Sequence, residues 1–337
     1  MKSYIDLLGD IVTNSEIIQN RTGINANMVI GRHFSHDMKT GFPLLTTKKV
    51  NLHTIAVELE GFIKGITDKR WYQSRKCYIW DEWCSPTIIQ SKYNLGHMEQ
   101  LQLLTDQQRK SPSMSPKMQP LLDSINRLDV EMITPDMVRK AIQLYESDLG
   151  PVYGYQWRHY GKQYYVNESN GMYTYDAFDG VDQLARLVDT MKSNPYDRRM
   201  VVTALNPLEI HNNTLALPPC HWAFEVHSNG IEFDLLWHQR SVDVFLGLPY
   251  NIASYALLMK LLEKETGLIA RQLHGFLGNV HIYDNHMNQV NTQRQREPFE
   301  LPKLILPDNV NIFDWEATQW KLDNYQHHGF LKGEVAV

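Results

Sequence analysis

The chain has 337 residues, of which 43% are hydrophobic and 21% are charged, a composition typical of a soluble globular protein. This length favours one large domain with an elaboration over two full domains. The formal net charge of -5 gives no general reason to bind a nucleic-acid polymer, so any anion site must be a local cluster of Arg and Lys. No long uncharged apolar run is present, and we expect no membrane partner.

The three cysteines, Cys77, Cys84 and Cys220, are odd in number and show no C-x-x-C spacing. This pattern argues against a zinc site or a disulfide framework and favours reduced thiols in a cytoplasmic protein that holds no metal. Residues 1–23 have the pattern of an amphipathic helix rather than of a signal peptide.

The first part of the chain predicts a strand over 27–38 and a helix over 53–64. The character changes in residues 84–147, where a polar segment over 107–120 is rich in Pro and Ser. Because a long structureless connection inside a compact fold is usually functional or disordered, we interpret 84–147 as an inserted small subdomain or lid with a mobile loop.

The remainder alternates helical and strand patterns. Residues 180–194 have the period of a helix, and another helix begins near residue 251. Alternating or continuous apolar character predicts strands over 200–206, 221–228 and 231–241. These patterns predict an α+β protein built on a sheet.

Cys220 follows two prolines and precedes His221 in "LPPCH". The prolines fix the backbone approach, which holding a thiol at a set angle requires. A free cysteine is, however, among the most buried residue types, and a packed core thiol is the alternative. The motif alone does not decide between a nucleophile and a core residue.

The segment 237–256 gathers polar side chains before a Gly-x-Pro turn. Arg240 and the adjacent Ser241 can bind an oxyanion with N–H donors and a hydroxyl. Asn251 is either the N-cap of the next helix or a carboxamide that donates to and accepts from a planar heterocycle. A surface strand of mixed polarity is the alternative for the whole segment.

Further arginines stand near predicted turns: Arg21 precedes a Gly, and Arg198 and Arg199 are adjacent. Most exposed arginines serve solvation or surface pairing. Together with Arg240 they would form a phosphate cradle if they converge, which the sequence does not decide.

Glu58 lies on the apolar face of its predicted helix, whereas Glu60 lies about 200° round the axis. A carboxylate that faces a core next to a cleft is a candidate proton handler. Trp80 and Trp83 offer flat apolar area for a fused-ring ligand, although structural packing is the commoner use of Trp.

The chain resembles the thymidylate synthase family. The resemblance runs in the family's order from residue 20 to the last residue, apart from the 84–147 insertion. It rests on the stretches "NRTG", "GFPLLTTKKV", "IWDEW", "DLGPVYGYQWRHYG", "DRRMVVTALNP", "ALPPCHWAFEV", "QRSVDVFLGLPYNIASYALL", "GNVHIYDNHMNQV", "REPFELPKL" and "KGEVAV".

This resemblance implies an α+β, three-layer fold with a large mixed β-sheet packed by helices, in which a sheet face forms a homodimer interface. It implies one catalytic domain over 1–337 with 84–147 inserted in it. The location implied is the cytoplasm, or the host cytoplasm for a phage protein.

The resemblance also implies a reaction, in which a one-carbon unit passes from 5,10-methylenetetrahydrofolate to C5 of dUMP through a covalent bond between Cys220 and C6. The products are dTMP and dihydrofolate. Catalytic roles are implied for Cys220, Glu58, Asn251, Arg240, His221 and Tyr153. Binding of dUMP is implied for Arg21, Gln239, Arg240, Ser241, Asp243, Asn251, His281 and Tyr283, and for Arg198 and Arg199 across the dimer interface. The folate cosubstrate is implied to contact Lys48, Ile79, Trp80, Trp83, Asp243, Leu246, Gly247, Tyr250 and Ala336.

Several positions depart from the family pattern and keep an alternative open. We expect these departures to cluster around the uracil ring and the folate, where a polar path would let water capture the exocyclic methylene. The enzyme would then be a dUMP hydroxymethylase or a related pyrimidine-modifying enzyme. A non-enzymatic RNA-binding use of the fold is a further alternative. The departures are Asn51, Glu60, Gly61, Glu225, His238 and Asn279.

Overall fold

The computed structural model describes residues 1–19, 23–162 and 180–334, which form two compact units. The boundary falls within helix α2 (Leu52–Ile63). The first unit comprises Met1–Glu60, Gln183–Thr203 and Cys220–Val337, and the second comprises Gly61–Asp182 and Ala204–Pro219.

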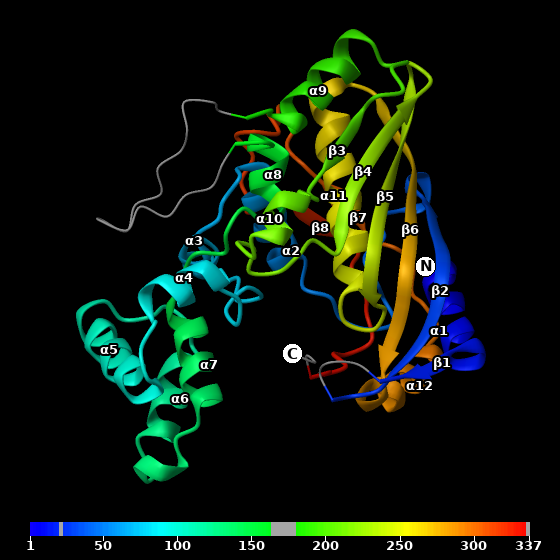
Figure 1. Ribbon diagram of the computed structural model, residues 1–337. Helices are drawn as coiled ribbons and strands as arrows, with labels where there is room; N and C mark the ends of the chain where they lie inside the picture. Colours follow the sequence, from blue (N-terminus) through cyan, green and yellow to red (C-terminus); the bar gives the residue numbers. More distant parts are fainter. Residues whose placement is uncertain (20–22, 163–179, 335–337) are drawn as a thin grey trace. The chain divides into compact units, whose positions relative to one another are not determined.

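The first unit is built on a six-stranded sheet with the strand order β1-β2-β6-β5-β4-β3 (Figure 1). Strands β5 and β6 run parallel and all other neighbours in this sheet run antiparallel, so the predicted mixed sheet is confirmed. The strands are β1 (Glu16–Ile18), β2 (Ala26–Asp37), β3 (Val201–Thr203), β4 (His221–Ser228), β5 (Glu232–Asp243) and β6 (Ile269–Tyr283).

Helices pack on this sheet and complete the predicted α+β architecture. A separate two-stranded sheet pairs β7 (Lys303–Ile305) with β8 (Lys321–Asp323). Besides α2, the helical elements of the first unit are α1 (Lys2–Asn14), η1 (Met38–Thr40), α9 (Gln183–Ser193), α11 (Leu248–Thr266), η3 (Asp284–His286) and α12 (Met287–Arg294).

Helix α11 connects the parallel strands β5 and β6 and is buried on most of its surface, as expected for a helix that is apolar nearly all round. Its Tyr255 stacks on Trp237 of β5 with ring centroids 5.4 Å apart. Gly275 lies opposite Trp237 on β6, where an added Cβ would be 2.3 Å from the indole ring. Glycine at this position therefore makes room for the largest side chain of the core.

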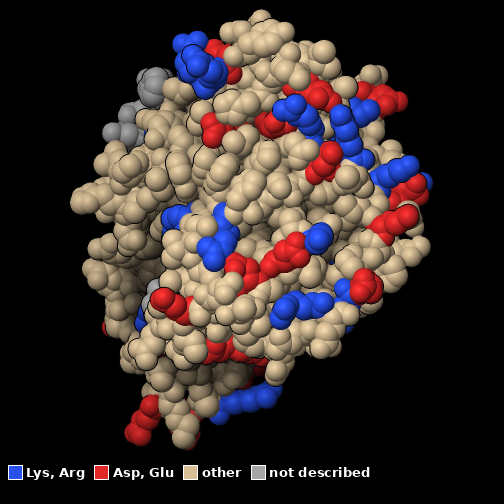
Figure 2. All heavy atoms as spheres, turned by 90° about the vertical axis from the view of Figure 1, so that its right-hand side faces the viewer, with Lys and Arg blue, Asp and Glu red and all other residues tan. Residues whose placement is uncertain are grey.

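The opposite face of the sheet carries a mixed row of aromatic and polar side chains. His33 of β2 and Phe276 of β6 lie 5.0 Å apart between ring centroids, and Phe276 stacks on His238 of β5 at 5.4 Å. Phe276 is 42% exposed and Ile30 is 63% exposed. On the face seen in Figure 2, Lys and Arg lie among Asp and Glu rather than in one large patch.

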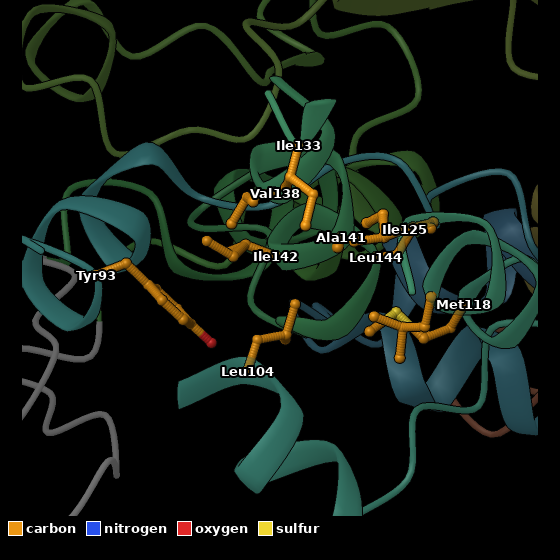
Figure 3. Close-up of a cluster of buried hydrophobic side chains, with 10 residues drawn as sticks. Tyr93, Leu104, Met118, Ile125, Ile133, Val138, Ala141, Ile142 and Leu144 are labelled. Atoms are coloured by element: carbon orange, nitrogen blue, oxygen red, sulfur yellow. The ribbon is translucent and has the colours of Figure 1, made fainter. Parts of the chain in front are cut away.

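The second unit is helical. Its elements are α3 (Lys69–Ser74), α4 (Pro86–Lys92), α5 (His97–Lys110), α6 (Met118–Ile125), η2 (Val130–Met132), α7 (Pro135–Tyr145), α8 (Tyr153–His159) and α10 (Pro207–His211). Helices α4 to α7 belong to the predicted insertion and enclose a hydrophobic cluster of their own, which includes Tyr93, Leu104, Val138 and Ile142 (Figure 3). That the whole chain forms a single domain stays a prediction.

Candidate active site

Cys220 lies directly before β4 and next to Arg240 of β5. The backbone N–H of Arg240 donates to the carbonyl of Cys220 at 2.8 Å, and Nη2 of Arg240 lies 3.9 Å from Sγ of Cys220. The Cys220 thiol is half-buried, whereas those of Cys77 and Cys84 are fully buried, and none of the three is in a disulfide within the described part of the chain. Among the three cysteines, Cys220 is thus the one that a ligand can reach beside a fixed positive charge.

Two opposing effects set the acidity of Cys220. Burial raises the pKa of the thiol, and the Arg240 guanidinium lowers it by a smaller amount, so that the net shift is upward. The free enzyme therefore holds mainly the thiol at neutral pH, and attack on a ligand requires removal of its proton.

His221, the next residue, is a buried neutral imidazole. Its Nδ1 lies 2.9 Å from the hydroxyl of Tyr255 on α11. Burial lowers the pKa of His221 to about 3, so the ring carries no charge at neutral pH. It can orient neighbouring groups through hydrogen bonds, but it adds no cation beside Cys220.

Polar side chains gather at the end of β5, where Gln239, Ser241 and Asp243 occupy alternate positions. The parallel register pairs Ser241 with Asn279 and Asp243 with His281 of β6, so these polar residues form a row side by side. The buried positions of β5 change from Trp237 and Gln239 to Val242, so the alternation breaks at Arg240 and Ser241. Gln239 accepts a hydrogen bond from the indole N–H of Trp237 at 3.1 Å, which puts Gln239 on the face that carries α11.

Asn251, in the first turns of α11, reaches the same row. Nε2 of Gln239 donates to Oδ1 of Asn251 at 3.1 Å and to the carbonyl of Ser241 at 3.0 Å. The carboxamide of Asn251 is half-buried and keeps both N–H groups and one lone pair. The structure thus fixes Asn251 by a side chain and does not use it as a helix cap, because α11 begins at Leu248.

Asp243 shapes the turn between β5 and α11. Its Oδ1 accepts hydrogen bonds from the backbone N–H groups of Phe245 and Leu246 at 2.8 and 3.0 Å. The turn leaves Leu246, Gly247 and Tyr250 half-buried. All three of these predicted folate contacts therefore remain accessible on one short segment.

Lys48 is predicted to contact folate, but the structure buries it. The side chain is 5% exposed, its Nζ donates to the carbonyl of Phe245, and the ammonium lies 3.8 Å from the centroid of the Phe245 ring. Burial lowers the pKa of Lys48 to about 8, against a smaller opposing effect of Asp243. As described, Lys48 supports the turn after β5 and is not an open cation.

His281 and Tyr283 lie on β6 beside this row. Nδ1 of His281 lies 2.8 Å from Oδ1 of Asn279, and the rings of His281 and Tyr283 meet edge to face at 5.1 Å. Burial lowers the pKa of His281. Asn279, a departure from the family pattern, thus orients an imidazole of the predicted dUMP site.

The expected orientation of Glu58 and Glu60 on α2 is wrong. Glu60 is 1% exposed and Glu58 is half-buried, the reverse of the expectation from apolar periodicity. The reason is a distant segment: Oε2 of Glu60 accepts the backbone N–H of Ala317 at 3.0 Å. Burial by a chain segment more than 250 residues away is not encoded in the local helix pattern.

In the second unit, Trp80 is packed rather than open. It is 5% exposed, with Tyr153 and Phe62 at centroid distances of 6.1 and 6.5 Å, both edge-on. Of the two uses that the sequence leaves open for Trp80, this burial favours structural packing. Ile79, at 40% exposed, and the half-buried Trp83 are the accessible predicted folate contacts of this loop.

Two of the predicted arginine contacts are exposed, and two further predicted contacts fall on residues that the structure does not describe. Arg198 and Arg199 are exposed before β3, and Arg199 forms an ion pair with Asp197 at 2.8 Å. Arg21 and Ala336 lie outside the described residues.

Two of the departures, Glu225 and His238, contact each other, whereas Asn279 lies beside His281 of the predicted dUMP site. Oε1 of Glu225 lies 2.9 Å from Nε2 of His238, and Oε2 lies 3.1 Å from Nε2 of His227. Alternation along β4 puts Glu225 on the face opposite Phe224, which contacts Tyr255 of α11. Glu225 and His238 thus form one polar group on the exposed sheet face, away from the row that contains Gln239.

The described residues include no group of three or more His, Cys, Asp or Glu side chains arranged to hold a metal ion. In the same ranges, no helix has both the length and the apolar composition needed to span a membrane.

The fold and the site together define a class: an α+β protein in which an accessible cysteine thiol lies beside an arginine guanidinium. Residues 2–337 match the family model described as thymidylate synthase. The chain is 35% identical to the thymidylate synthase of Malacoplasma penetrans, 36% to that of Mesoplasma florum and 35% to that of Mycoplasma pneumoniae, with full coverage of both chains each time. The chain belongs to the thymidylate synthase family.

Proposed function

We propose that this protein transfers a one-carbon unit from 5,10-methylenetetrahydrofolate to C5 of dUMP and releases dTMP and dihydrofolate. The observation that carries the proposal is the placement of the half-buried Cys220 thiol 3.9 Å from the Arg240 guanidinium, next to the row of Gln239, Ser241 and Asn251. Such a pair suits a ligand with an electrophilic carbon and an anionic group.

In this proposal Arg240 and Ser241 bind the 5′-phosphate, with Arg21 from the same chain. Asn251 uses its free N–H to donate to O4 of uracil and its remaining lone pair to accept N3–H. His281 and Tyr283 bind the 3′-hydroxyl of the ribose. These contacts hold C6 of the ring against Sγ of Cys220, and positioning of this kind supplies a large part of a catalytic effect.

The covalent step forms a bond between Sγ of Cys220 and C6, and the C5–C6 double bond becomes an enolate that is stabilised through O4. The Cys220 proton leaves to solvent, and Glu58 is the candidate group that moves protons at C5 and O4. C5 then forms a bond to the methylene carbon carried by the folate. Loss of the C5 proton breaks the bond between this methylene and the folate nitrogen and leaves an exocyclic methylene on the ring. Hydride addition to that methylene expels the Cys220 thiolate from C6 and restores the C5–C6 double bond.

The folate cosubstrate supplies the methylene group and, on its oxidation to dihydrofolate, the hydride that completes the methyl group. Leu246, Gly247 and Tyr250 present an accessible segment for its ring system. Oδ2 of Asp243, which lies 3.9 Å from Nδ1 of His286, is the atom that we assign to a hydrogen bond with the pterin. Exclusion of water at this stage favours hydride transfer over hydration.

We also propose that two copies associate through the exposed face of the six-stranded sheet in the cytoplasm. The 63% exposed Ile30 and the 42% exposed Phe276 support this arrangement, because apolar side chains on a broad face gain from coverage. Arg198 and Arg199, exposed in one protomer, then contribute to the phosphate site of the other.

The hydroxymethylase alternative has no support from the two departures Glu225 and His238, since both lie on the sheet face opposite α11.

Incubation with dUMP and 5,10-methylenetetrahydrofolate, with nucleotide mass and folate absorbance as readouts, tests the proposal. We expect dTMP and dihydrofolate in equal amounts. Formation of 5-hydroxymethyl-dUMP with tetrahydrofolate would contradict the proposal. A Cys220→Ala variant whose cellular role is unaffected would favour the non-enzymatic RNA-binding alternative.

A further inference from the structure

The loop that carries Trp80 and Trp83 is fixed by a carboxylate at its centre. Asp81 is 1% exposed; its Oδ1 accepts a hydrogen bond from Nε2 of Gln73 at 2.9 Å and its Oδ2 accepts one from Oγ of Ser115 at 2.5 Å. Gln73 belongs to α3, next to the loop, whereas Ser115 belongs to the inserted residues 84–147. The insertion therefore contributes half of the partners of this buried carboxylate.

A buried lysine makes the same connection through the backbone. Lys69 is 1% exposed, and its Nζ donates to the carbonyls of Asp81 at 2.8 Å and of Trp83 at 3.1 Å, and also to the carbonyl of Gln143 in α7. Two loop carbonyls and one carbonyl of the insertion thus share one ammonium group. On the outside, Lys117 of the insertion pairs with Glu82 of the loop.

The inserted side of these contacts is itself well fixed. The segment 107–120 is expected to be a mobile loop, but Ser115 within it is 5% exposed. Its backbone N–H donates to Oγ of Ser113, and its Oγ accepts from the backbone N–H of Lys117. The adjacent Met118 is 1% exposed in the hydrophobic cluster of the insertion (Figure 3). Ser115 is therefore held by a packed body and not by a free loop.

We propose that the insertion holds the 79–83 loop in the conformation that binds folate, with Ser115 acting as a positioning residue through Asp81. This inference rests on the proposed function, because it assigns folate to that loop. All the contacts that carry it lie within the second unit.

The physical argument concerns a buried acceptor. A carboxylate that loses one of its donors in a dry environment is strongly disfavoured, so the loop must shift to find water or a new partner. A shift of the loop displaces Ile79 and Trp83, which weakens folate binding. The residues assigned to dUMP belong to the first unit, so dUMP binding should be spared.

Replacement of Ser115 by Ala removes the hydroxyl and adds no bulk. We expect the KM for 5,10-methylenetetrahydrofolate to rise about tenfold, with the KM for dUMP and the kcat at saturating folate unchanged. Ser115→Thr keeps the hydroxyl and should restore most of the folate affinity.

Tyr93→Phe is the matched control. The Tyr93 hydroxyl lies 2.6 Å from Oε1 of Glu146 and 2.7 Å from Oε1 of Gln107, and both of these residues belong to the insertion. Its loss destabilises the insertion without removing a contact to the loop, so the KM for folate should stay unchanged.

The proposed role of the insertion is contradicted if Ser115→Ala leaves the KM for folate unchanged, or if Ser115→Ala and Tyr93→Phe raise this KM equally. Calorimetric titration of the unmodified enzyme with dUMP separates this failure from failure of the proposed function. If dUMP binds and dTMP forms, a KM for folate that does not distinguish Ser115→Ala from the unmodified enzyme or from Tyr93→Phe refutes only the role of the insertion. If the unmodified enzyme forms no dTMP, both proposals fail.

Discussion

Nη2 of Arg240 lies 3.9 Å from Sγ of Cys220, while the backbones of the same two residues are joined by a 2.8 Å hydrogen bond. The pairing of β4 with β5 thus places the Arg240 guanidinium beside the Cys220 thiol. Arginine stays charged at any working pH, so it can stabilise a thiolate without titrating itself.

The first prediction concerns this pair. Arg240→Leu removes the charge that counteracts burial, so the pKa of Cys220 rises further above its ordinary range. Alkylation of Cys220 by iodoacetamide should become several-fold slower at pH 8, and its pH profile should move to higher pH. Mass spectrometry of the labelled peptides measures this directly.

Cys84 serves as the internal control, because burial raises its pKa to about 12 and keeps it unreactive in both proteins. An unchanged alkylation profile in Arg240→Leu would show that the guanidinium does not act on the thiol.

A second prediction concerns Asn251. Asn251→Asp replaces the N–H donor that we assign to O4 of uracil by an oxygen that can accept from the 4-amino group of cytosine. The ratio of kcat/KM for dUMP to that for dCMP should fall by at least about tenfold, as expected when a buried polar group loses its partner.

Gln239 donates to Oδ1 of residue 251 and suits either side chain, so the variant should fold normally. Equal preference before and after the change would remove Asn251 from base recognition.

A third prediction uses the buried neutral His221. The pKa of His221 is about 3 in the folded protein and about 6.5 in the unfolded chain. As the pH falls, the unfolded chain therefore takes up the proton at a higher pH than the folded protein does. This residue's contribution to stability is fully present above pH 6.5 and is lost as the pH falls toward 3, at up to about 1.4 kcal/mol per pH unit.

His221→Gln retains a hydrogen-bonding side chain that does not titrate. Urea unfolding between pH 7 and 4 should give a shallower loss of the free energy of unfolding for this variant than for the unmodified protein. Parallel pH profiles would contradict the neutral buried state.

A fourth prediction separates the two sheet faces. Glu225→Gln weakens the contacts with His227 and His238 on the exposed face but leaves the face that carries α11 intact. The kcat and the identity of the product should stay the same, while sedimentation should report weaker self-association. A switch of product to 5-hydroxymethyl-dUMP would instead place Glu225 in control of the reaction.

Local patterns predict the elements of the fold well where periodicity is strong. The helix expected over 53–64 is α2 at Leu52–Ile63, and the strand expected over 27–38 is β2 at Ala26–Asp37. The longest strand, β6, carries no assigned element from sequence, because Gly275 and Gly278 interrupt its apolar pattern. The reason for Gly275 is Trp237 on a neighbouring strand, a contact that only the sheet reveals.

The candidate site is likewise predictable from the sequence where motifs are dense, and unpredictable where distant segments decide burial. The cysteine, the arginine and the Asn of α11 stand in dense motifs. Strand pairing places Arg240 beside Cys220, and Gln239 of the same strand contacts Asn251. The burial of Lys48 and Glu60 depends on Phe245 and Ala317, each about 200 or more residues away. Tyr255 and Lys69 escape notice in the sequence, since an apolar helix and a polar turn give no signal of their buried partners.

The most direct test of the central claim is trapping of the covalent bond to Cys220. C5 must lose its proton after the one-carbon unit is attached, so 5-fluoro-dUMP, with fluorine at C5, should stall the reaction with the ring still bound. Incubation with this analogue and 5,10-methylenetetrahydrofolate should give a protein whose mass rises by both molecules, with the label on the Cys220 peptide and none on Cys220→Ala. Absence of the adduct, or a label on Cys77 or Cys84, would contradict the account.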